Sequence, residues 1–505
     1  MEQTTFAVKA DQIGRSFTEW VSLSRFKVLF WIALLALLVS KGAALWPGYA
    51  LDDYAASSVP RSALFTLSQG RFTQSALQIL QNLLELRATP TAWPGMLLFL
   101  PAASLAIAAG IEVITKGKGD LAILAGCAAL MAAFPYLTEY LTFRESVLPQ
   151  AVSFALLAYF LTSIALGDVR ATSTTRWIRV SRIAALALLA GCQQTAFLVA
   201  VFFVLGRTFF AVRSGSTSPL TSLHQNRGLL IEVCLATVVY LLLALVLRGL
   251  FQAGGDERGQ LLALQDVAER APTVARYLGS LLVSGDPLIA PALKVGLLGV
   301  LVAALILAAR QNLGYALLCA MLWIVMICAS VLLLAVSKIW WPVPRAAYAI
   351  VFAHGVTLLL LLAPSEPKWA TRVLAIAIAF LAVGMGFKSH QILADQQRLN
   401  RWDMWVAGVL VQDLLRADIG SESRVVIVGA RWYHPVGPVT TIGDLNTSAL
   451  PVSWAVGGLL REATGRQWSI TAVPELKAVC STQHVWPDPR SIQKTGTGDV
   501  VVCMN

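Results

Sequence analysis

The first residues that could do chemistry are two adjacent acids. Asp52 and Asp53 lie in the segment Gly48-Tyr-Ala-Leu-Asp-Asp-Tyr54, directly after the first long apolar block. A carboxylate in a partly apolar cleft has a raised pKa and can act as a general base. Adjacent side chains of an extended chain face opposite ways, so one acid could react while the other orients a neighbour. The alternative is that the pair caps an amphipathic helix expected after Ser57.

Two further polar groups follow along the chain. Arg71, in Gln69-Gly-Arg-Phe72, adds a cation to the same stretch. The segment Pro135-Tyr-Leu-Thr-Glu-Tyr-Leu-Thr-Phe-Arg-Glu-Ser146 carries Glu139 and Arg144, which could hold a hydroxyl and an anion, or simply neutralise each other. We expect three side chains of these stretches to bind an acceptor molecule: Tyr54, Tyr136 and Glu139.

A third group is Lys338-Ile-Trp-Trp-Pro-Val-Pro-Arg345. Its two indoles are typical of lipid anchors at a membrane interface. Arg345 begins the next apolar block, and a planar guanidinium there is suited to binding phosphate. Carboxylates, cations and amides from separate stretches together favour transfer of a group from a phosphate-bearing lipid to a hydroxyl. A carboxylate would take the hydroxyl proton, and cations would stabilise the phosphate as it leaves.

These residues must be positioned by an apolar framework. Of the 505 residues, 57% are hydrophobic and only 13% are charged, which excludes an ordinary cytosolic enzyme and a disordered scaffold. Apolar blocks close to the ~20 residues of a bilayer-spanning helix recur from Phe26 to Lys388. We interpret the first as a retained helix rather than a signal peptide. The predicted all-α polytopic domain has spans at about 26–46, 93–114, 120–138, 147–166, 228–248, 287–309, 313–336, 346–364 and 373–388.

The block at 183–206 decides the topology, because arginines flank it on both sides (Arg176, Arg179, Arg182; Arg207, Arg213). If both flanks are cytoplasmic, the block must be a hairpin of two short helices. Its apex would be Gly191-Cys192-Gln193-Gln194, where polar groups can reach water or ligand. The rival, one helix with a basic loop outside, inverts everything downstream and fits the charge bias less well.

The hairpin gives about eleven segments, with the N-terminus in the cytoplasm and the C-terminus outside. Basic residues then outnumber acidic ones only in the cytoplasmic stretches, so the net charge of +11 reflects topology and not nucleic-acid binding. On this topology, five side chains are expected to bind the donor and its phosphate: Arg71, Arg144, Gln194, Lys338 and Arg345.

The tail, residues 389–505, has an ordinary composition and is predicted to be a separate small α/β domain after the membrane domain 1–388. A helical run extends to about Asp418, and strands are expected at 424–429 and 499–503. Cys480 and Cys503 are the only cysteines of the tail. An oxidising exterior would let them pair, but the sequence does not give their separation.

The order of these motifs resembles the Gtr-type (type II) glucosyltransferases that modify O-antigen, part of the GT-C superfamily of polyprenyl-phosphate-sugar-dependent enzymes. The resemblance covers about residues 26–390: an Asp-Asp pair after the first helix, a Gly-Arg, a Gln at a short-helix apex and a Pro-Arg opening a late span. It implies that Asp52 or Asp53 is the catalytic acid of the first loop and that Gln194 and Arg345 line the donor cleft. An aromatic residue usually precedes the apex glutamine. Here Cys192 and Gln193 precede it, so which glutamine is equivalent stays open.

The resemblance also implies the substrates and the compartment. The donor would be undecaprenyl-phosphate glucose and the acceptor a glycan such as the O-antigen of lipopolysaccharide. Transfer would invert the anomeric carbon on the periplasmic face of a bacterial inner membrane. Some relatives use a divalent cation near the first-loop acid, so a metal cofactor stays open.

Two other classes of protein remain as alternatives. A transporter or lipid flippase with an external accessory domain would carry ionisable or helix-breaking residues near mid-membrane, whereas the predicted spans are mostly apolar there. An inactive anchor that presents the tail to a partner would need no acid at Asp52 or Asp53. The sequence has no GxGxxG, P-loop, GxSxG or zinc-binding spacing that would indicate soluble catalytic machinery.

Overall fold

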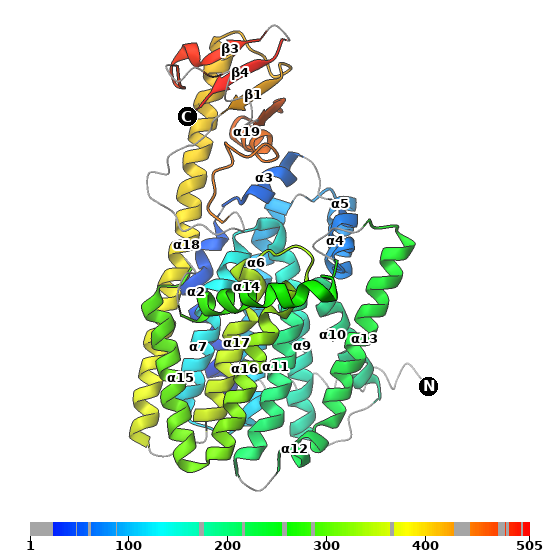
Figure 1. The fold of residues 1–505 in the computed structure, drawn as a ribbon, viewed down its shortest axis with the longest axis vertical. Helices are drawn as coiled ribbons and strands as arrows, with labels where there is room; N and C mark the ends of the chain where they lie inside the picture. The colour runs from blue at the N-terminus through cyan, green and yellow to red at the C-terminus, as the bar shows by residue number, and fades with distance from the viewer. Residues whose placement is uncertain are drawn as a thin grey trace.

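The computed structural model of the chain describes residues 24–46, 48–58, 62–86, 88–170, 176–214, 218–254, 260–283, 288–363, 368–428, 445–472, 480, 484–495 and 498–504. Within these ranges the protein is a tall helical bundle with a small sheet domain at one end (Figure 1). We call this end of the bundle the domain end and the other the opposite end.

Ten spans of the described residues are long and apolar enough to cross a membrane. Their helices are α2 (Ser24–Lys41), α6 (Ala88–Thr115), α7 (Leu121–Ala133) with α8 (Pro135–Leu141), α9 (Arg144–Arg170), α11 (Gln194–Phe210), α13 (Arg227–Leu250), α15 (Pro291–Gln311), α16 (Leu313–Val336), α17 (Ala349–Leu362) and α18 (Lys368–Arg416). With the slightly shorter α10 (Arg176–Cys192), these elements match the predicted number of about eleven segments.

The hairpin at 183–206 is present as two helices. α10 and α11 pack against each other and are separated by a single residue, Gln193, whose backbone is extended. α11 is followed by the short helices η2 (Ala211–Ser214) and α12 (Pro219–Gln225), and α12 lies at the opposite end (Figure 1). The apex of the hairpin therefore points to the domain end, as the flanking arginines predicted.

One predicted span is interrupted. The block 120–138 was expected to be a single helix, but Phe134 is extended and separates α7 from α8. The reason is Pro135, which disfavours a helical conformation in the residue before it and cannot donate a hydrogen bond. After the break, α8 carries Glu139 and Tyr140.

The boundary between the two predicted domains lies inside a helix. α18 runs for 49 residues, about 70 Å, from the bundle into the sheet domain (Figure 1). Ser389, just past the predicted boundary, donates from its Oγ to the carbonyl of Ala133. The sheet domain is therefore attached through a continuous helix and not through a loop.

The sheet domain contains four short strands in the order β2-β1-β4-β3. β1 (Val425–Val428) is parallel to β2 (Ile470–Ala472) and β4 (Val500–Cys503), while β3 (Ile492–Lys494) is antiparallel to β4. η6 (Pro489–Ser491) precedes β3, and α19 (Val456–Thr464) packs with the outer half of α18 in the domain core. Cys480 and Cys503 form a disulfide, with their Cα atoms 5.5 Å apart.

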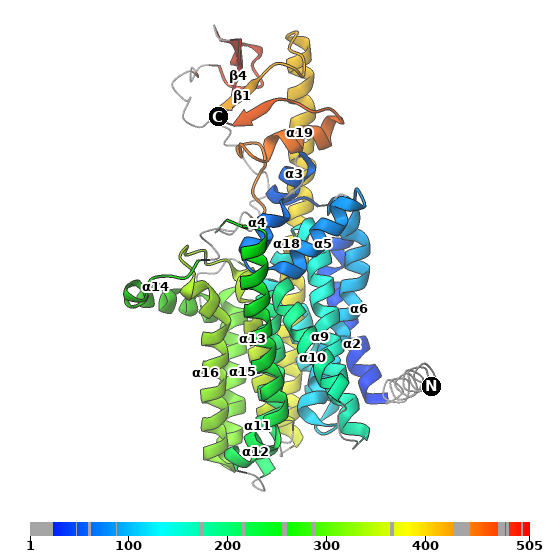
Figure 2. The same ribbon diagram turned by 90° about the vertical axis from the view of Figure 1, so that its right-hand side faces the viewer.

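Several short helices cover the domain end of the bundle. η1 (Gly42–Leu45), α3 (Leu51–Ser58), α4 (Ala63–Ser68) and α5 (Phe72–Leu83) follow α2, and η4 (Pro344–Ala347) precedes α17. α14 (Leu264–Leu282) lies across the bundle axis and projects from its side (Figures 1 and 2). The sequence analysis predicts no helix between the spans 228–248 and 287–309, so α14 was missed.

Candidate functional site

The apex of the α10–α11 hairpin is a meeting point for distant segments. Gln193 is buried, and its Oε1 accepts a hydrogen bond of 2.7 Å from the Tyr140 hydroxyl of α8. Gln194 donates from Nε2 to the carbonyl of Gln69, at 3.3 Å. Thr195 donates to the carbonyl of Ala346 in η4, at 3.0 Å. The first loop, α8 and the start of α17 are therefore all tied to this apex.

α5 presents its polar face to the protein and its apolar face outward. Gln74, Ser75 and Gln78 are buried, whereas Leu80 and Leu83 are exposed. This inverted pattern is expected for a helix that contacts lipid on one side and a polar interior on the other. α5 begins against the hairpin, where the ring of Phe72 covers Gly191 so closely that a Cβ there would lie 2.5 Å from a ring carbon.

Asp53 binds the beginning of α9. Its carboxylate accepts hydrogen bonds from the backbone N–H groups of Ala50 (2.8 Å), Arg144 (3.0 Å) and Glu145 (3.1 Å). Burial raises the pKa of Asp53 to about 6, and these three N–H donors oppose the shift. The acid pair was considered as a cap for a helix after Ser57. The structure instead uses Asp53 at the start of α9.

Asp52 differs from its neighbour in exposure. Both acids lie in the first turn of α3, but the side chain of Asp52 is partly exposed, whereas Asp53 is fully buried. The three backbone hydrogen bonds belong to Asp53 alone. Asp52 is therefore the acid of the pair that an incoming molecule could reach.

Arg144 supports the first loop. Its Nε donates to the carbonyl of Gly48 (2.7 Å) and its Nη1 to the carbonyl of Ala44 (2.8 Å), and the side chain is buried. Arg144 does not form the suggested pair with Glu139. Its hydrogen bonds hold the segment that leads to Asp52 and Asp53.

Glu139 pairs with Arg345, 206 residues away in the chain. The carboxylate accepts from the backbone N–H of Arg345 (2.6 Å) and from its Nη1 (3.3 Å), and it is fully buried. The guanidinium carbon lies 4.3 Å from the centre of the Phe143 ring. Since Phe143 precedes Arg144, whose N–H binds Asp53, the acid loop and Arg345 are connected through residues 139–145.

Arg71 lies close to the apex. Its Nε is buried and has no hydrogen-bond partner among the described residues. The guanidinium is near enough to Cys192 to act on it electrostatically. None of the ion pairs in the described part of the chain involves Arg71. This cation therefore differs from Arg345, whose charge is balanced by Glu139.

The other predicted site residues have structural contacts. Tyr136 is buried and donates from its hydroxyl to the carbonyl of Leu281 at the end of α14. Lys338 lies on the loop beside α14, where its Nζ donates to Gln260 Oε1 at 3.3 Å. The described contacts place Lys338 with α14 and not with the hairpin apex.

The first loop is also attached to α18 and the sheet domain. The side-chain amide of Asn400 pairs with the backbone of Tyr49, accepting from its N–H (2.6 Å) and donating to its carbonyl (2.8 Å). The Tyr49 hydroxyl donates to Glu462 of α19, and its ring stacks on Tyr54 with 5.1 Å between centroids. Burial and the Glu462 carboxylate raise the pKa of Tyr49 to about 12, which keeps the hydroxyl protonated as a donor.

Four buried polar atoms at the domain end were not identified from the sequence. Among the described residues, no hydrogen-bond partner reaches the side-chain oxygens of Gln74, Thr138, Gln150 and Tyr348. A buried polar group without a partner costs about 1–3 kcal/mol. The inverted polarity of α5 was the one sequence signal that could have indicated Gln74.

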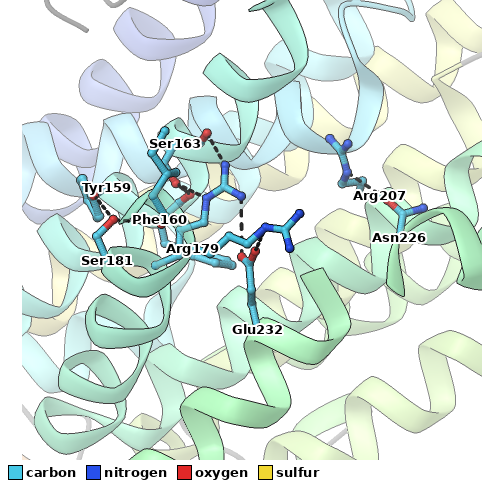
Figure 3. Close-up of polar contacts among 10 residues, drawn as sticks. Tyr159, Phe160, Ser163, Arg179, Ser181, Arg207, Asn226 and Glu232 are labelled. Carbon is cyan, nitrogen blue, oxygen red and sulfur yellow. Dashed lines mark hydrogen bonds and ion pairs between the residues drawn. The ribbon is translucent and has the colours of Figure 1, made fainter. Parts of the chain in front are cut away.

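The opposite end has a polar cluster of a different kind, which we call the Glu232 cluster (Arg179, Arg182, Glu232 and Ser163). Glu232 is buried and lies 3.6 Å from Arg182 Nη1 and 3.9 Å from Arg179 Nε. Arg182 also donates from Nε to Ser163 Oγ at 2.8 Å. Figure 3 shows Arg179 directed at Glu232, with a separate contact between Arg207 and Asn226 nearby.

A divalent cation has no evident set of ligands here. The described residues contain no group of three or more His, Cys, Asp or Glu side chains that could hold a metal ion. Asp53 Oδ2 accepts two backbone N–H groups and Oδ1 accepts one. The described residues therefore show no ready-made metal centre. The sequence Arg431-Trp-Tyr-His434 of the tail also suggests contact with a sugar, but these residues lie outside the described part of the chain.

No protein-family model matches the chain. No curated protein matches it either.

Proposed function

We propose that the protein is an integral-membrane hexosyltransferase of the GT-C type. It would move a hexose, glucose in the first instance, from a polyprenyl phosphate to an acceptor glycan such as O-antigen on the periplasmic side. The observation that carries the proposal is that α3, which carries Asp52, lies at the same end of an apolar bundle as Arg71 and the hairpin apex. The disulfide of the sheet domain at the same end supports an extracytoplasmic location, because disulfides persist in oxidising compartments.

The proposed reaction needs a base and a stabilised leaving group. Asp52 takes the proton of the acceptor hydroxyl, and the acceptor oxygen attacks the anomeric carbon of the hexose. The bond from that carbon to the phosphate oxygen breaks, and polyprenyl phosphate leaves with the electron pair. One glycosidic bond replaces one phosphate ester, and the anomeric configuration inverts. The proton ends on Asp52 and is then lost to water.

The surrounding residues have supporting roles in this proposal. Arg71, whose charge has no carboxylate partner among the described residues, faces the phosphate and stabilises its developing charge. Arg345 is assigned to the donor side as well, with its orientation fixed by Glu139. Asp53 and Arg144 hold the loop that carries Asp52. No step requires a nucleotide, because the phosphate ester is the activated bond.

Release of lipid phosphate tests the proposal. Purified protein is incubated with polyprenyl-phosphate glucose, mannose or arabinose and with a lipopolysaccharide fraction, and free polyprenyl phosphate is measured. We expect release with one sugar above the others, together with sugar on the acceptor. Movement of the intact lipid across vesicle membranes without release would instead support a flippase, and would contradict the transferase.

Labelling from each side of the membrane tests the orientation. Asn82 at the end of α5 and His224 in α12 are exposed at the two ends of the bundle. Each is changed to cysteine in a chain from which the exposed free cysteines Cys234 and Cys328 have been removed. We expect a membrane-impermeant maleimide to label N82C in intact cells and H224C only after permeabilisation. The reverse pattern would place the site in the cytoplasm and contradict the proposal.

A further inference from the structure

The four buried oxygens without partners belong to elements that meet at the hairpin apex. Tyr348 is fully buried, and its ring centre lies 6.4 Å from that of Tyr140, whose hydroxyl binds Gln193. Tyr348 is also close enough to Cys192 to act on it electrostatically. The Tyr348 hydroxyl therefore belongs to the same cluster as the apex.

The other three oxygens come from three different helices of this cluster. Gln150 follows Pro149, whose carbonyl accepts from the Cys192 thiol at 3.1 Å. Thr138 lies next to Glu139 on α8, two residues before Tyr140. Gln74 follows Thr73, whose hydroxyl donates to the carbonyl of Leu188 in α10 at 2.9 Å. α5, α8, α9 and the start of α17 thus each carry one of the four oxygens, and each of these elements contacts the hairpin.

The chemistry of these groups selects a class of ligand. Two are amide oxygens and two are hydroxyls, so none carries charge at neutral pH. Amide oxygens accept hydrogen bonds and would repel the oxygens of a phosphate, and buried polar atoms are a poor surface for a hydrocarbon chain. The hydroxyl donors of a neutral sugar ring can supply hydrogen bonds to such oxygens. Two aromatic rings, Phe154 and Tyr140, flank Tyr348, and the centre of each lies 6.4 Å from that of Tyr348.

We propose that Gln74, Thr138, Gln150 and Tyr348 bind the hydroxyl groups of the hexose on the lipid donor. This inference rests on the proposed transferase function and deepens it. It assigns the sugar to the neutral groups around the apex, whereas the phosphate is assigned to Arg71. Recognition of the sugar is then separate from recognition of the lipid phosphate, in residues and in chemistry.

Removing an oxygen that has no protein partner separates a binding role from a structural one. Tyr348→Phe removes the hydroxyl oxygen of Tyr348, and Gln150→Leu removes the amide oxygen of Gln150. Neither oxygen has a hydrogen-bond partner in the described part of the chain, so its removal breaks no such hydrogen bond. We expect the melting temperature of each variant to stay the same or rise. We expect binding of polyprenyl-phosphate glucose to weaken about tenfold, as for the loss of one good hydrogen bond to a ligand, with binding of bare polyprenyl phosphate unchanged.

Tyr315→Phe is the matched control. Tyr315 is also a buried tyrosine, but its hydroxyl donates to the carbonyl of Leu360 at 3.1 Å and lies away from the apex in α16. The same chemical change there should lower the melting temperature and leave the binding of both lipids unaltered.

The outcomes distinguish the two proposals. If the wild type binds the glucose-bearing lipid more tightly than the bare one, and Tyr348→Phe and Gln150→Leu remove that difference, the hexose site is supported. If the variants keep the difference, or if both lipids bind the wild type equally, the hexose site is overturned while lipid binding stands. If neither lipid binds the wild type, the transferase proposal fails and the hexose site fails with it.

Discussion

The two ends of the bundle differ in how their buried polar groups are paired. In the Glu232 cluster the carboxylate forms ion pairs with Arg182 and Arg179, and Arg182 also donates to Ser163, although Glu232 Oε2 has no hydrogen-bond partner among the described residues. Around the hairpin apex, neutral oxygens and the Nε of Arg71 are buried without partners in the described part of the chain. The two clusters are about 16 Å apart along α10, between Arg182 and Gln193, at 1.5 Å per residue.

This difference separates a structural polar cluster from a candidate binding site. A buried ion-pair cluster fixes helices relative to each other, and breaking it costs stability. Buried groups without protein partners reduce stability and are expected where a ligand satisfies them. Variants at the Glu232 cluster should therefore change stability, and variants at the domain end should change binding or transfer.

The largest expected effect is on transfer by Asp52→Asn. Loss of a general base lowers rates by about 100-fold to 10,000-fold, and an amide in place of the partly exposed carboxylate keeps the size of the side chain. Release of polyprenyl phosphate should fall by at least 100-fold, with donor binding and melting temperature unchanged. Full activity of this variant would show that Asp52 is not the base. The domain end would then have no assigned catalytic residue.

The next effect is on stability, by Glu232→Gln at the opposite end. The change leaves the buried guanidinium of Arg182 without a carboxylate, which costs about 3 kcal/mol. Denaturation in mild detergent should show this loss, and the remaining folded protein should bind the lipid donor normally. A selective loss of donor binding at full stability would instead make the Glu232 cluster a binding site.

Arg71→Gln should have a smaller effect, on binding. Removing a cation from the lipid phosphate is expected to weaken binding of polyprenyl phosphate about tenfold, or about 1.4 kcal/mol, without loss of stability. Titration of the bare lipid phosphate measures it directly. Arg416→Gln, at an exposed arginine on the outer part of α18, serves as the control for loss of one positive charge. If both substitutions weaken binding of the lipid phosphate equally, the effect comes from the net charge of the protein and not from a contact with Arg71.

The smallest effect is a pH dependence of stability that arises from Asp53. Burial raises its pKa in the folded protein to about 6, above the unfolded value of 3.8, so folding favours the protonated acid. Its contribution to stability is full below pH 3.8 and is lost as pH rises through 6. Between pH 5 and pH 7 the wild type should lose about 1 kcal/mol relative to Asp53→Asn. The free energy of unfolding of both proteins is measured at pH 5 and at pH 7. If it changes by the same amount in the wild type and in Asp53→Asn, the raised pKa of Asp53 is contradicted.

Much of the fold could be predicted from the sequence because it depends on local composition. Long apolar blocks specify helices without reference to their neighbours, and the arginines on both sides of 183–206 were enough to predict the hairpin and its apex. The strands at 425–428 and 500–503 were expected from short apolar runs. α14 was missed because its charged residues exclude it from a search for long apolar blocks. The break at Phe134 was also missed, although Pro135 indicates it.

The sequence predicted where most of the expected residues lie, but not how they pair. Most of the expected residues lie at the domain end, yet Glu139 pairs with Arg345 and not with nearby Arg144. Partners 206 residues apart are decided by how helices pack, which local composition does not encode. The different roles of Asp52 and Asp53 depend in the same way on where the start of α9 lies. The four oxygens without partners can be recognised only once their surroundings are known.

Photo-crosslinking compares the two ends of the bundle in one measurement. A polyprenyl-phosphate glucose that carries a diazirine on the sugar is bound to the purified protein, and the complex is irradiated. The labelled peptides are then identified by mass spectrometry. Our account predicts labels in residues 69–78, 138–150, 191–195 and 345–348 that unlabelled donor competes away. Competed labels confined to the peptides around Ser163, Arg179 and Glu232 would contradict it.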